Sequence, residues 1–225
     1  MKKIITLLIC GLFLFNFPLR IGAEVGGCEV NCVAQTLPDY TDPNWISEAN
    51  ENNRNQITTF STKNLFINSL YQNSYTSTIM QTCGYSIASS GCALTSVTMV
   101  SNFLNNRALT PVNVNSLMGN YACPFYWYEA ESRLNIDVKL FKSSGLTTSY
   151  INSELYTQLN NNVPVIIGMT LANGSSHYVV VKGYNYSGAK YEFYINDPNQ
   201  NSGKTTLNAY LSSGATIKQL IVYGK

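Results

Sequence analysis

Apolar side chains recur at a helical spacing in one stretch near the middle of the chain. The members of this stripe are Leu94, Val97, Val100 and Leu104, flanked by Met99 and Phe103. Positions three or four residues apart lie on one face of a helix, and the Asn105-Asn106 pair is suited to ending it. Ser89 and Ser90, just before Gly91, are residue types that cap helices. The pattern predicts a helix that begins near Gly91 and has Cys92 in its first turn.

Shorter apolar patterns predict further helices and, later in the chain, strands. Helices are expected at residues 114–118, 127–134 and 150–159, and strands at 164–169, 178–184, 190–195 and 217–223. The strand segments are rich in β-branched residues, and residues 185–188 favour a hairpin turn. We therefore expect an α+β fold in which N-terminal helices pack on a C-terminal antiparallel sheet.

The beginning of the chain shows neither the spacing of apolar residues typical of a helix nor the alternation typical of a strand. Two lysines precede a short apolar run, and small residues at 21–23 end it, which is typical of a secretory signal peptide over residues 1–23. Residues 24–59 are rich in Asn, Asp, Glu, Pro and Gly, and we interpret them as a polar linker or pro-segment. We therefore expect a secreted, extracellular protein with a globular domain at residues 60–225 and no membrane span.

Composition and charge narrow the possible functions. The 225 residues are 45% hydrophobic and 12% charged, which is typical of a globular protein with a weakly charged surface. Three of the 14 basic residues lie in the signal segment, so 11 remain against 12 acidic residues. This balance argues against nucleic acid or a membrane surface as a partner. A single histidine, His177, excludes a multi-histidine metal site, and we expect no cofactor.

Export also changes the interpretation of the cysteines. Without the signal segment five cysteines remain, and an odd number in an oxidising compartment leaves one unpaired. Cys28 and Cys32 are close enough in sequence to pair locally, and Cys83 can pair with Cys123. Cys92 is then the free thiol. At a helix start it ionises more readily, because the open N–H groups and the helix dipole stabilise an anion.

The predicted strands bring a carboxylate to the single histidine. His177 comes just before the strand at 178–184, and Asp197 follows the strand at 190–195. In an antiparallel hairpin the start of one strand lies beside the end of the next, so the two side chains are expected to be neighbours. Asp197 can then orient the imidazole by accepting its N–H.

Four short blocks of sequence occur in a characteristic order. They are SGCALTSVTMV at residues 90–100, NVPVI at 162–166, HYVVVKGY at 177–184 and INDP at 195–198. Over roughly residues 70–225 they resemble the C39-like cysteine peptidases, a branch of the papain-like group. The resemblance implies a papain-like fold in which Cys92 is the nucleophile, His177 the acid and base, and Asp197 the orienting group.

The same resemblance implies a glutamine upstream of the cysteine that helps to bind the oxyanion. Gln72 is the favoured candidate, because the segment 70–75 resembles the corresponding family segment. Ser74 and Tyr75 nevertheless stand where the family usually has Asp and Trp. Gln81, closer to the cysteine, is the alternative.

Three functions are compatible with the sequence. The first is a secreted thiol hydrolase that cleaves peptide bonds with Cys92, His177 and Asp197, and its partner is a peptide or protein substrate. The second is the same chemistry on a peptidoglycan cross-link, as a cell-wall amidase or endopeptidase. The third is a catalytically idle papain-like module that binds a partner. Because all three residues are present, the first is favoured.

Overall fold

A computed structural model of the chain describes residues 61–188 and 190–225. The predicted signal peptide at 1–23, the linker at 24–59 and the Cys28–Cys32 pair lie outside the described residues. Within the described part, no helix combines the length and the apolar character that crossing a membrane requires.

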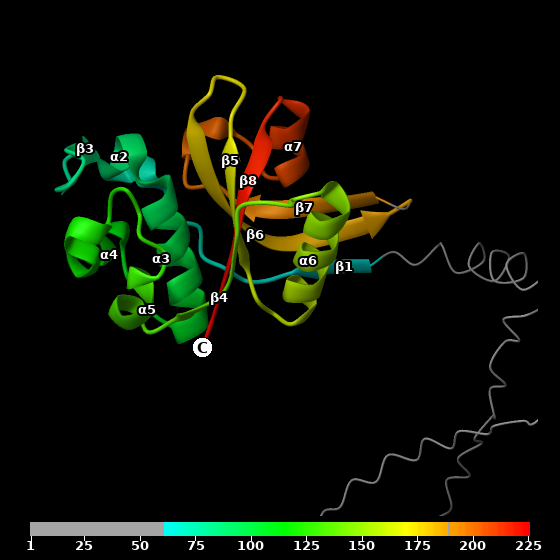
Figure 1. Ribbon diagram of the computed structural model, residues 1–225, viewed down its shortest axis with the longest axis horizontal. Coiled ribbons are helices and arrows are strands. Elements are labelled where there is room, and N and C mark those ends of the chain that lie inside the picture. The colour runs from blue at the N-terminus through cyan, green and yellow to red at the C-terminus, as the bar shows by residue number, and fades with distance from the viewer. Residues whose placement is uncertain (1–60, 189) are drawn as a thin grey trace, which may run out of the picture. The chain divides into compact units, whose positions relative to one another are not determined.

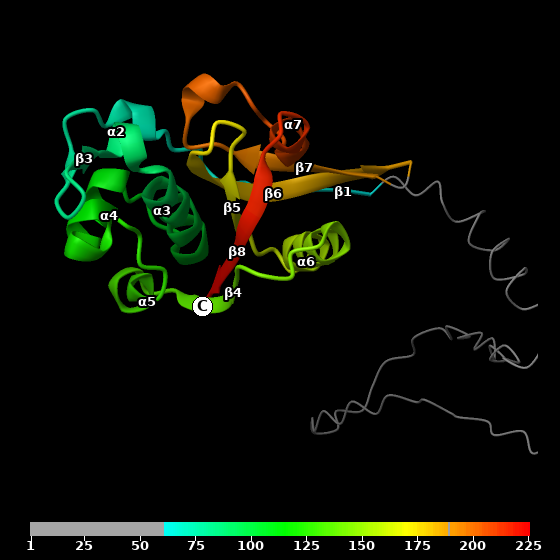
Figure 2. The same ribbon diagram turned by 45° about the horizontal axis from the view of Figure 1, so that its top comes forward.

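Most helices lie in the first half of the described chain, and the longer strands lie in the second half. The strands are β1 (Ser61–Asn64), β2 (Ile79–Met80), β3 (Tyr85–Ser86), β4 (Asp137–Lys142), β5 (Val165–Thr170), β6 (Ser176–Ser187), β7 (Lys190–Asn196) and β8 (Thr216–Gly224). The α-helices are α2 (Ile87–Ser90), α3 (Cys92–Asn105), α4 (Pro111–Met118), α5 (Glu129–Leu134), α6 (Thr148–Asn160) and α7 (Leu207–Ser212). Short 3-10 helices are η1 (Gln72–Ser74), η2 (Gly119–Tyr121) and η3 (Gln200–Ser202). Helices α2 to α5 gather on one side of the strands, and α6 and α7 lie toward the other (Figures 1 and 2).

Six strands form an antiparallel sheet around β6. Its order is β1-β6-β5-β8-β4, and β7 pairs with β6 outside this path. The first half of β6 pairs with β5 and the second half with β1. Strand β7 pairs with residues of both halves, so it runs along the edge of β6 that faces away from β5 and β1. The α+β class and the antiparallel sheet expected from the sequence are confirmed.

Helix α3 forms as its apolar stripe predicts. Leu94, Val97 and Val100 are fully buried, and the helix packs against β6. Its C-cap is Asn106, with a φ of 50° in the left-handed region that asparagine tolerates at helix ends. The helix therefore fixes Cys92 at a defined position beside the sheet.

Some element boundaries differ from the sequence predictions. The helix expected at 127–134 begins at Glu129, and Trp127 precedes it in a turn. Strand β6 extends through Ser187, so most of the predicted hairpin turn belongs to the strand. Pairing with β1 and β7 on both edges stabilises this extension.

Strands β1 to β4 and the short helices α2 and α7 were not predicted. Strands β1 and β4 lie at the two ends of the sheet order, and their side chains are half-buried or exposed. Edge strands of this kind tolerate lysine and polar residues, so their sequences lack an apolar run. The sequence predicted that the helices come first and the strands of the sheet follow. This order holds for the central strands, but β1 and β4 come earlier in the chain.

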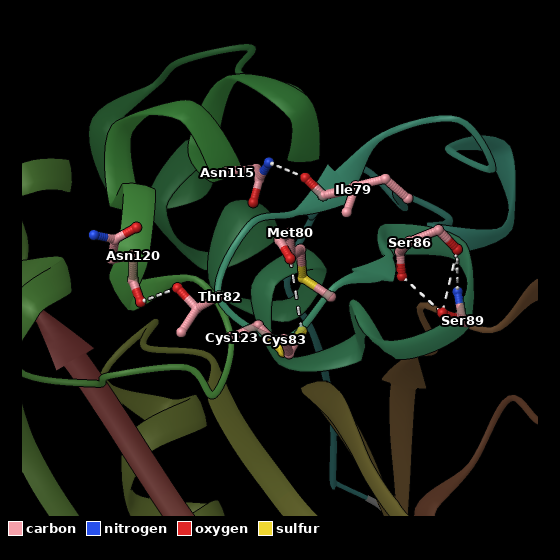
Figure 3. The surroundings of a disulfide bond; sticks show 9 residues. All are labelled: Ile79, Met80, Thr82, Cys83, Ser86, Ser89, Asn115, Asn120 and Cys123. Atoms are coloured by element: carbon pink, nitrogen blue, oxygen red, sulfur yellow. Dashed lines mark hydrogen bonds between the residues drawn. A yellow bond between two sulfur atoms is a disulfide. The ribbon is translucent and has the colours of Figure 1, made fainter.

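A disulfide joins two parts of the helical side. Cys83 and Cys123 are bonded, with a Cα–Cα distance of 5.7 Å, as the cysteine pattern suggested. The bond connects the β2–β3 hairpin to the loop after η2 (Figure 3). Nearby, Thr82 Oγ1 donates to the Asn120 carbonyl at 2.9 Å, and Asn115 Nδ2 donates to the Ile79 carbonyl at 3.3 Å. These links hold the loop that leads toward Trp127.

Candidate active site

Cys92 is the first residue of α3 and, among the described residues, the free cysteine. No side chain caps this helix, whose N-cap is Gly91. The expectation that Ser89 and Ser90 cap it is wrong: they end the short helix α2, and Ser86 caps that helix by accepting the Ser89 N–H. The first N–H groups of α3 are therefore not used by a capping side chain.

Gly91 allows the close junction between α2 and α3. Its N–H donates to the Ile87 carbonyl at 2.8 Å. A Cβ added at Gly91 would lie 2.5 Å from that carbonyl oxygen and 2.6 Å from Ile87 Cγ2. Only glycine fits without displacement, so this residue determines where α3 begins and where the Cys92 sulfur lies.

His177 and Asp197 are brought together by strand pairing. His177 is the second residue of β6, and Asp197 follows the last residue of β7. The register pairs Val180 with Asn196, so the start of one strand and the end of the next are adjacent. His177 Nε2 lies 2.8 Å from Asp197 Oδ1, and both side chains are buried. The predicted proximity of the two residues is confirmed.

The surroundings of His177 favour its charged form. Burial by itself lowers the pKa of the imidazole, but hydrogen bonds to Asp197 and to the Cys92 side chain, with the charges of both, raise it to about 9. The ring therefore carries a proton at neutral pH. With Nε2 bonded to the carboxylate, the other ring nitrogen is left to face the sulfur.

Asp197 accepts hydrogen bonds from three groups besides the imidazole. The Asn199 N–H donates to Oδ1 at 2.8 Å, and the hydroxyls of Ser202 and Tyr210 both donate to Oδ2. Burial by itself raises the pKa of this carboxyl, but the hydrogen bonds from His177 and from the two hydroxyls outweigh it, and the pKa is lowered. The carboxylate is thus kept ionised and fixed in orientation.

Ser202 and Tyr210 were not identified from the sequence. Ser202 is the last residue of η3, in a segment rich in Asn, Ser and Gly. Tyr210 lies in α7, whose six residues carry no strong helical pattern. Sixteen tyrosines occur in the chain, so residue type alone does not single out one of them. The fold reveals the role of Tyr210, since its hydroxyl reaches a carboxylate 13 residues earlier.

Gln72 lies at the same cavity as Cys92 and His177. Its side chain is 7% exposed, and Nε2 donates to the Ala88 carbonyl at 2.9 Å. Its backbone N–H donates to the Pro198 carbonyl at 2.9 Å, which ties η1 to the turn after Asp197.

The alternative glutamine lies elsewhere. Gln81 is exposed and borders a different cavity, next to Asn115, Ser116 and Gly119. The fold thus brings Gln72 to the cysteine, although Gln81 is nearer to it in sequence.

A cavity of about 760 Å³ opens over these residues. One part of its wall is aromatic: the ring centroid of Trp127 lies 5.0 Å from that of Phe125 and 5.2 Å from that of Tyr178. The Tyr178 hydroxyl donates to Gln219 Oε1 at 2.8 Å, which holds its ring in place. The cavity is large enough to admit several residues of a polypeptide.

This arrangement contains the groups that acyl transfer requires. A thiol at a helix N-terminus lies in the same cavity as an imidazole, and the imidazole is hydrogen-bonded to an ionised carboxylate. Within residues 61–188 and 190–225, no group of three or more His, Cys, Asp and Glu side chains is placed to hold a metal ion.

Comparison with known proteins agrees with the geometry. The model of the Peptidase C39 like family matches residues 70–219, about two thirds of the chain. The match begins just before Gln72 and includes Cys92, His177 and Asp197. A search of curated proteins finds no match. The chain therefore belongs to the Peptidase C39-like family, a family of the cysteine-peptidase type.

Proposed function

We propose that the protein is a secreted cysteine peptidase that hydrolyses peptide bonds with Cys92 as nucleophile, His177 as acid and base, and Asp197 as the orienting group. The observation that carries this proposal is the placement of His177. Its Nε2 lies 2.8 Å from Asp197 Oδ1, and its ring lies in the same cavity as Cys92, whose side chain raises the pKa of the imidazole. A merely structural histidine does not need a thiol and a carboxylate on the same ring.

In the first half of the proposed reaction the enzyme is acylated. The Cys92 thiolate attacks the carbonyl carbon of the substrate, a C–S bond forms, and the carbonyl electron pair moves onto oxygen. The His177 imidazolium then gives its proton to the amide nitrogen, the C–N bond breaks, and the amine product leaves. The raised pKa of the imidazole, about 9, supports its role as the proton donor.

The second half hydrolyses the thioester. Neutral His177 takes a proton from water while the water oxygen attacks the acyl carbon, and the C–S bond then breaks. The acid product leaves, and the thiolate and imidazolium are restored. In both halves, the Gln72 amide and the Cys92 backbone N–H would bind the oxyanion. Burial of Gln72 beside the cavity supports this assignment.

Export is proposed from the sequence of residues 1–23. A protein acting outside the cell would carry the Cys83–Cys123 disulfide in a compartment that maintains it. N-terminal sequencing of the protein recovered from culture medium should begin at Glu24. Recovery only from inside the cell, with Met1 retained, would argue against export.

The test of the proposed function combines turnover with thiol labelling. We expect the wild-type protein to cleave members of a proteome-derived peptide library, detected by mass spectrometry, and Cys92→Ala to cleave none. His177→Ala should lower the rate of iodoacetamide labelling at pH 6 at least about tenfold, because the charge that stabilises the thiolate is removed. Asp197→Asn should reduce labelling less than turnover, since it misorients the ring without removing it.

The competing functions give different results in the same experiment. Equal labelling of wild type and His177→Ala, with no peptide cleaved, would indicate an idle binding module. Cleavage of purified muropeptides but not of library peptides would indicate a cell-wall amidase or endopeptidase.

A further inference from the structure

A second cavity, of about 630 Å³, borders the active-site cavity at Asn199. Its lining comes from β1, the segment at 69–71, the middle of β6, the end of β7 and the loop at 199–205. Polar side chains around it are Thr62, Asn64, Ser69, Tyr71, Gln200 and Thr205. These side chains can donate and accept hydrogen bonds with a polar ligand.

The charges in this cavity are unbalanced. Lys182 and Lys204 both line it, and the acidic residue among the described lining residues is Asp197. That carboxylate already accepts hydrogen bonds on both oxygens from the four donors described above. It forms no ion pair with either lysine within the described part of the chain. The cavity therefore presents positive charge without an anionic partner.

Lys182 is the more unusual of the two lysines. It projects from β6, the strand at the centre of the sheet, and is partly buried. Among the described residues its ammonium has no ion pair, and burial lowers its pKa. Partial burial of an unpaired cation reduces the stability of the fold. An anion bound beside the ammonium would pair with its charge and restore that stability.

Among the described residues, the contacts of the Lys204 ammonium are with neutral groups. Its Nζ lies 3.2 Å from Ser213 Oγ and 5.3 Å from the centroid of the Tyr210 ring. Neither contact neutralises the charge, so Lys204 remains a positively charged residue in the lining of this cavity.

A lysine can also lie partly buried because its aliphatic stem covers apolar surface. In that case the surroundings of the stem are apolar and the ammonium reaches water. The cavity that Lys182 lines carries hydroxyl and amide side chains such as Thr62 and Asn64, together with Tyr194 and Ile195 of β7. The polar members of this lining favour a ligand site over simple coverage of the core.

We propose that this cavity is a carboxylate-binding site in which Lys182 and Lys204 supply the charge and the hydroxyls of Ser69 and Tyr71 donate hydrogen bonds. The carboxylate has two possible sources. One is an acidic side chain of the polypeptide substrate, reached past Asn199, and this source rests on the proposed function. The other is a free small carboxylate, which binds whether or not the protein is a peptidase.

Citrate, tested against sodium chloride at equal ionic strength, is a suitable probe of the site. Saturating citrate should raise the melting temperature of the wild type by about 5 °C or more. Lys182→Met should lose most of this shift, while Lys218→Met, which removes an exposed lysine of β8 outside the cavity, should keep it. Without citrate, Lys182→Met should melt at or above the wild-type temperature, because it removes an unpaired cation.

Two results would overturn the site. One is a citrate shift in Lys182→Met equal to that of the wild type. The other is a Lys182→Met protein that melts clearly lower without citrate, which would mean that the ammonium is already satisfied within the fold.

Peptides distinguish the two sources of the carboxylate. For a peptide that the wild type cleaves, replacing its Asp and Glu residues outside the scissile bond by Asn and Gln should raise KM about tenfold and leave kcat unchanged. The difference should disappear in Lys182→Met. Equal KM values, with the citrate shift intact, would assign the site to a free carboxylate. Absence of any peptide cleavage would contradict the proposed function and leave the citrate result standing.

Discussion

Four donors converge on the Asp197 carboxylate, and they divide between its two oxygens. Oδ1 faces the imidazole and a backbone N–H, and Oδ2 accepts two hydroxyls. One oxygen thus orients His177 while the other fixes the carboxylate itself. This division makes the Tyr210 hydroxyl a positioning group that acts on the imidazole through Asp197.

Tyr210→Phe tests this positioning role. It keeps the ring and removes one hydrogen bond to a charged group, which should lower the free energy of unfolding at pH 7 by about 1.5–3 kcal/mol. The pKa of Asp197 is lowered in the folded state, so its hydrogen bonds stabilise the fold above its ordinary pKa and lose that effect as pH falls through the folded value. The deficit, measured by urea unfolding, should therefore shrink below about pH 4.

The matched control is Tyr85→Phe, the same change at a tyrosine that is 60% exposed. It should leave the free energy of unfolding unchanged. A Tyr210→Phe deficit that is the same at pH 3 and pH 7 would mean that the hydroxyl stabilises packing and not the ionised carboxylate.

The single imidazole permits a direct measurement of its protonation. In an NMR titration of untagged protein, we expect the His177 signal to change at about pH 9, well above the ordinary pKa of 6.5. Asp197→Asn and Cys92→Ala should each lower the midpoint, because each removes a hydrogen-bond partner and a negative charge that favour the imidazolium. A wild-type midpoint near 6.5 would contradict the proposed thiolate–imidazolium pair.

At the scale of elements, the sequence predicted the segments with strong periodicity. The buried stripe of α3 and the β-branched runs of β5 and β6 carry their own signal, and they place Cys92 and His177. Hairpin pairing was enough to add Asp197. These elements are largely buried on the faces that their patterns indicate.

The unpredicted features depend on long-range contacts. Strand β1 forms because β6 offers an edge more than a hundred residues later. Gln72 lies at the active-site cavity, and its N–H is hydrogen-bonded to the Pro198 carbonyl. No local pattern encodes these contacts. The donors Ser202 and Tyr210 were missed for the same reason, since each is identified only by its distance to Asp197.

The junction of α2 and α3 gives a prediction at this scale. Gly91→Ala would place a methyl group 2.5 Å from the Ile87 carbonyl oxygen, so one of the two helices must shift. We expect a loss of about 1–3 kcal/mol in the free energy of unfolding, together with slower iodoacetamide labelling of Cys92 at pH 6.

Ser90→Ala, at the exposed neighbouring position, is the control for this substitution. Its free energy of unfolding should stay within about 0.5 kcal/mol of the wild type. A Gly91→Ala protein with unchanged stability and labelling would show that the junction can relax and does not set the position of the sulfur.

At the scale of the whole molecule, the site depends on segments drawn from both ends of the described domain. The segment at 65–72, here called the strap, begins beside the middle of β6, where the Leu65 N–H donates to the Lys182 carbonyl at 2.7 Å. Asn196 Nδ2 donates to the Ile67 carbonyl at 2.8 Å, and its side chain is buried. Cleavage of the chain within this strap should therefore disturb the His177–Asp197 pair, although the strap is distant from both in sequence.

These contacts define where the chain can be shortened. A protein that begins at Phe60 keeps β1, the strap and Gln72, and should melt within about 4 °C of a protein that begins at Glu24, because residues 24–59 have a composition that buries little apolar surface. A protein that begins at Thr76 loses β1, the strap and Gln72, and should show no cooperative transition in circular dichroism. If the protein beginning at Phe60 melted far below the longer one, the linker would have to pack on the domain, and the proposed boundary at residue 60 would be wrong.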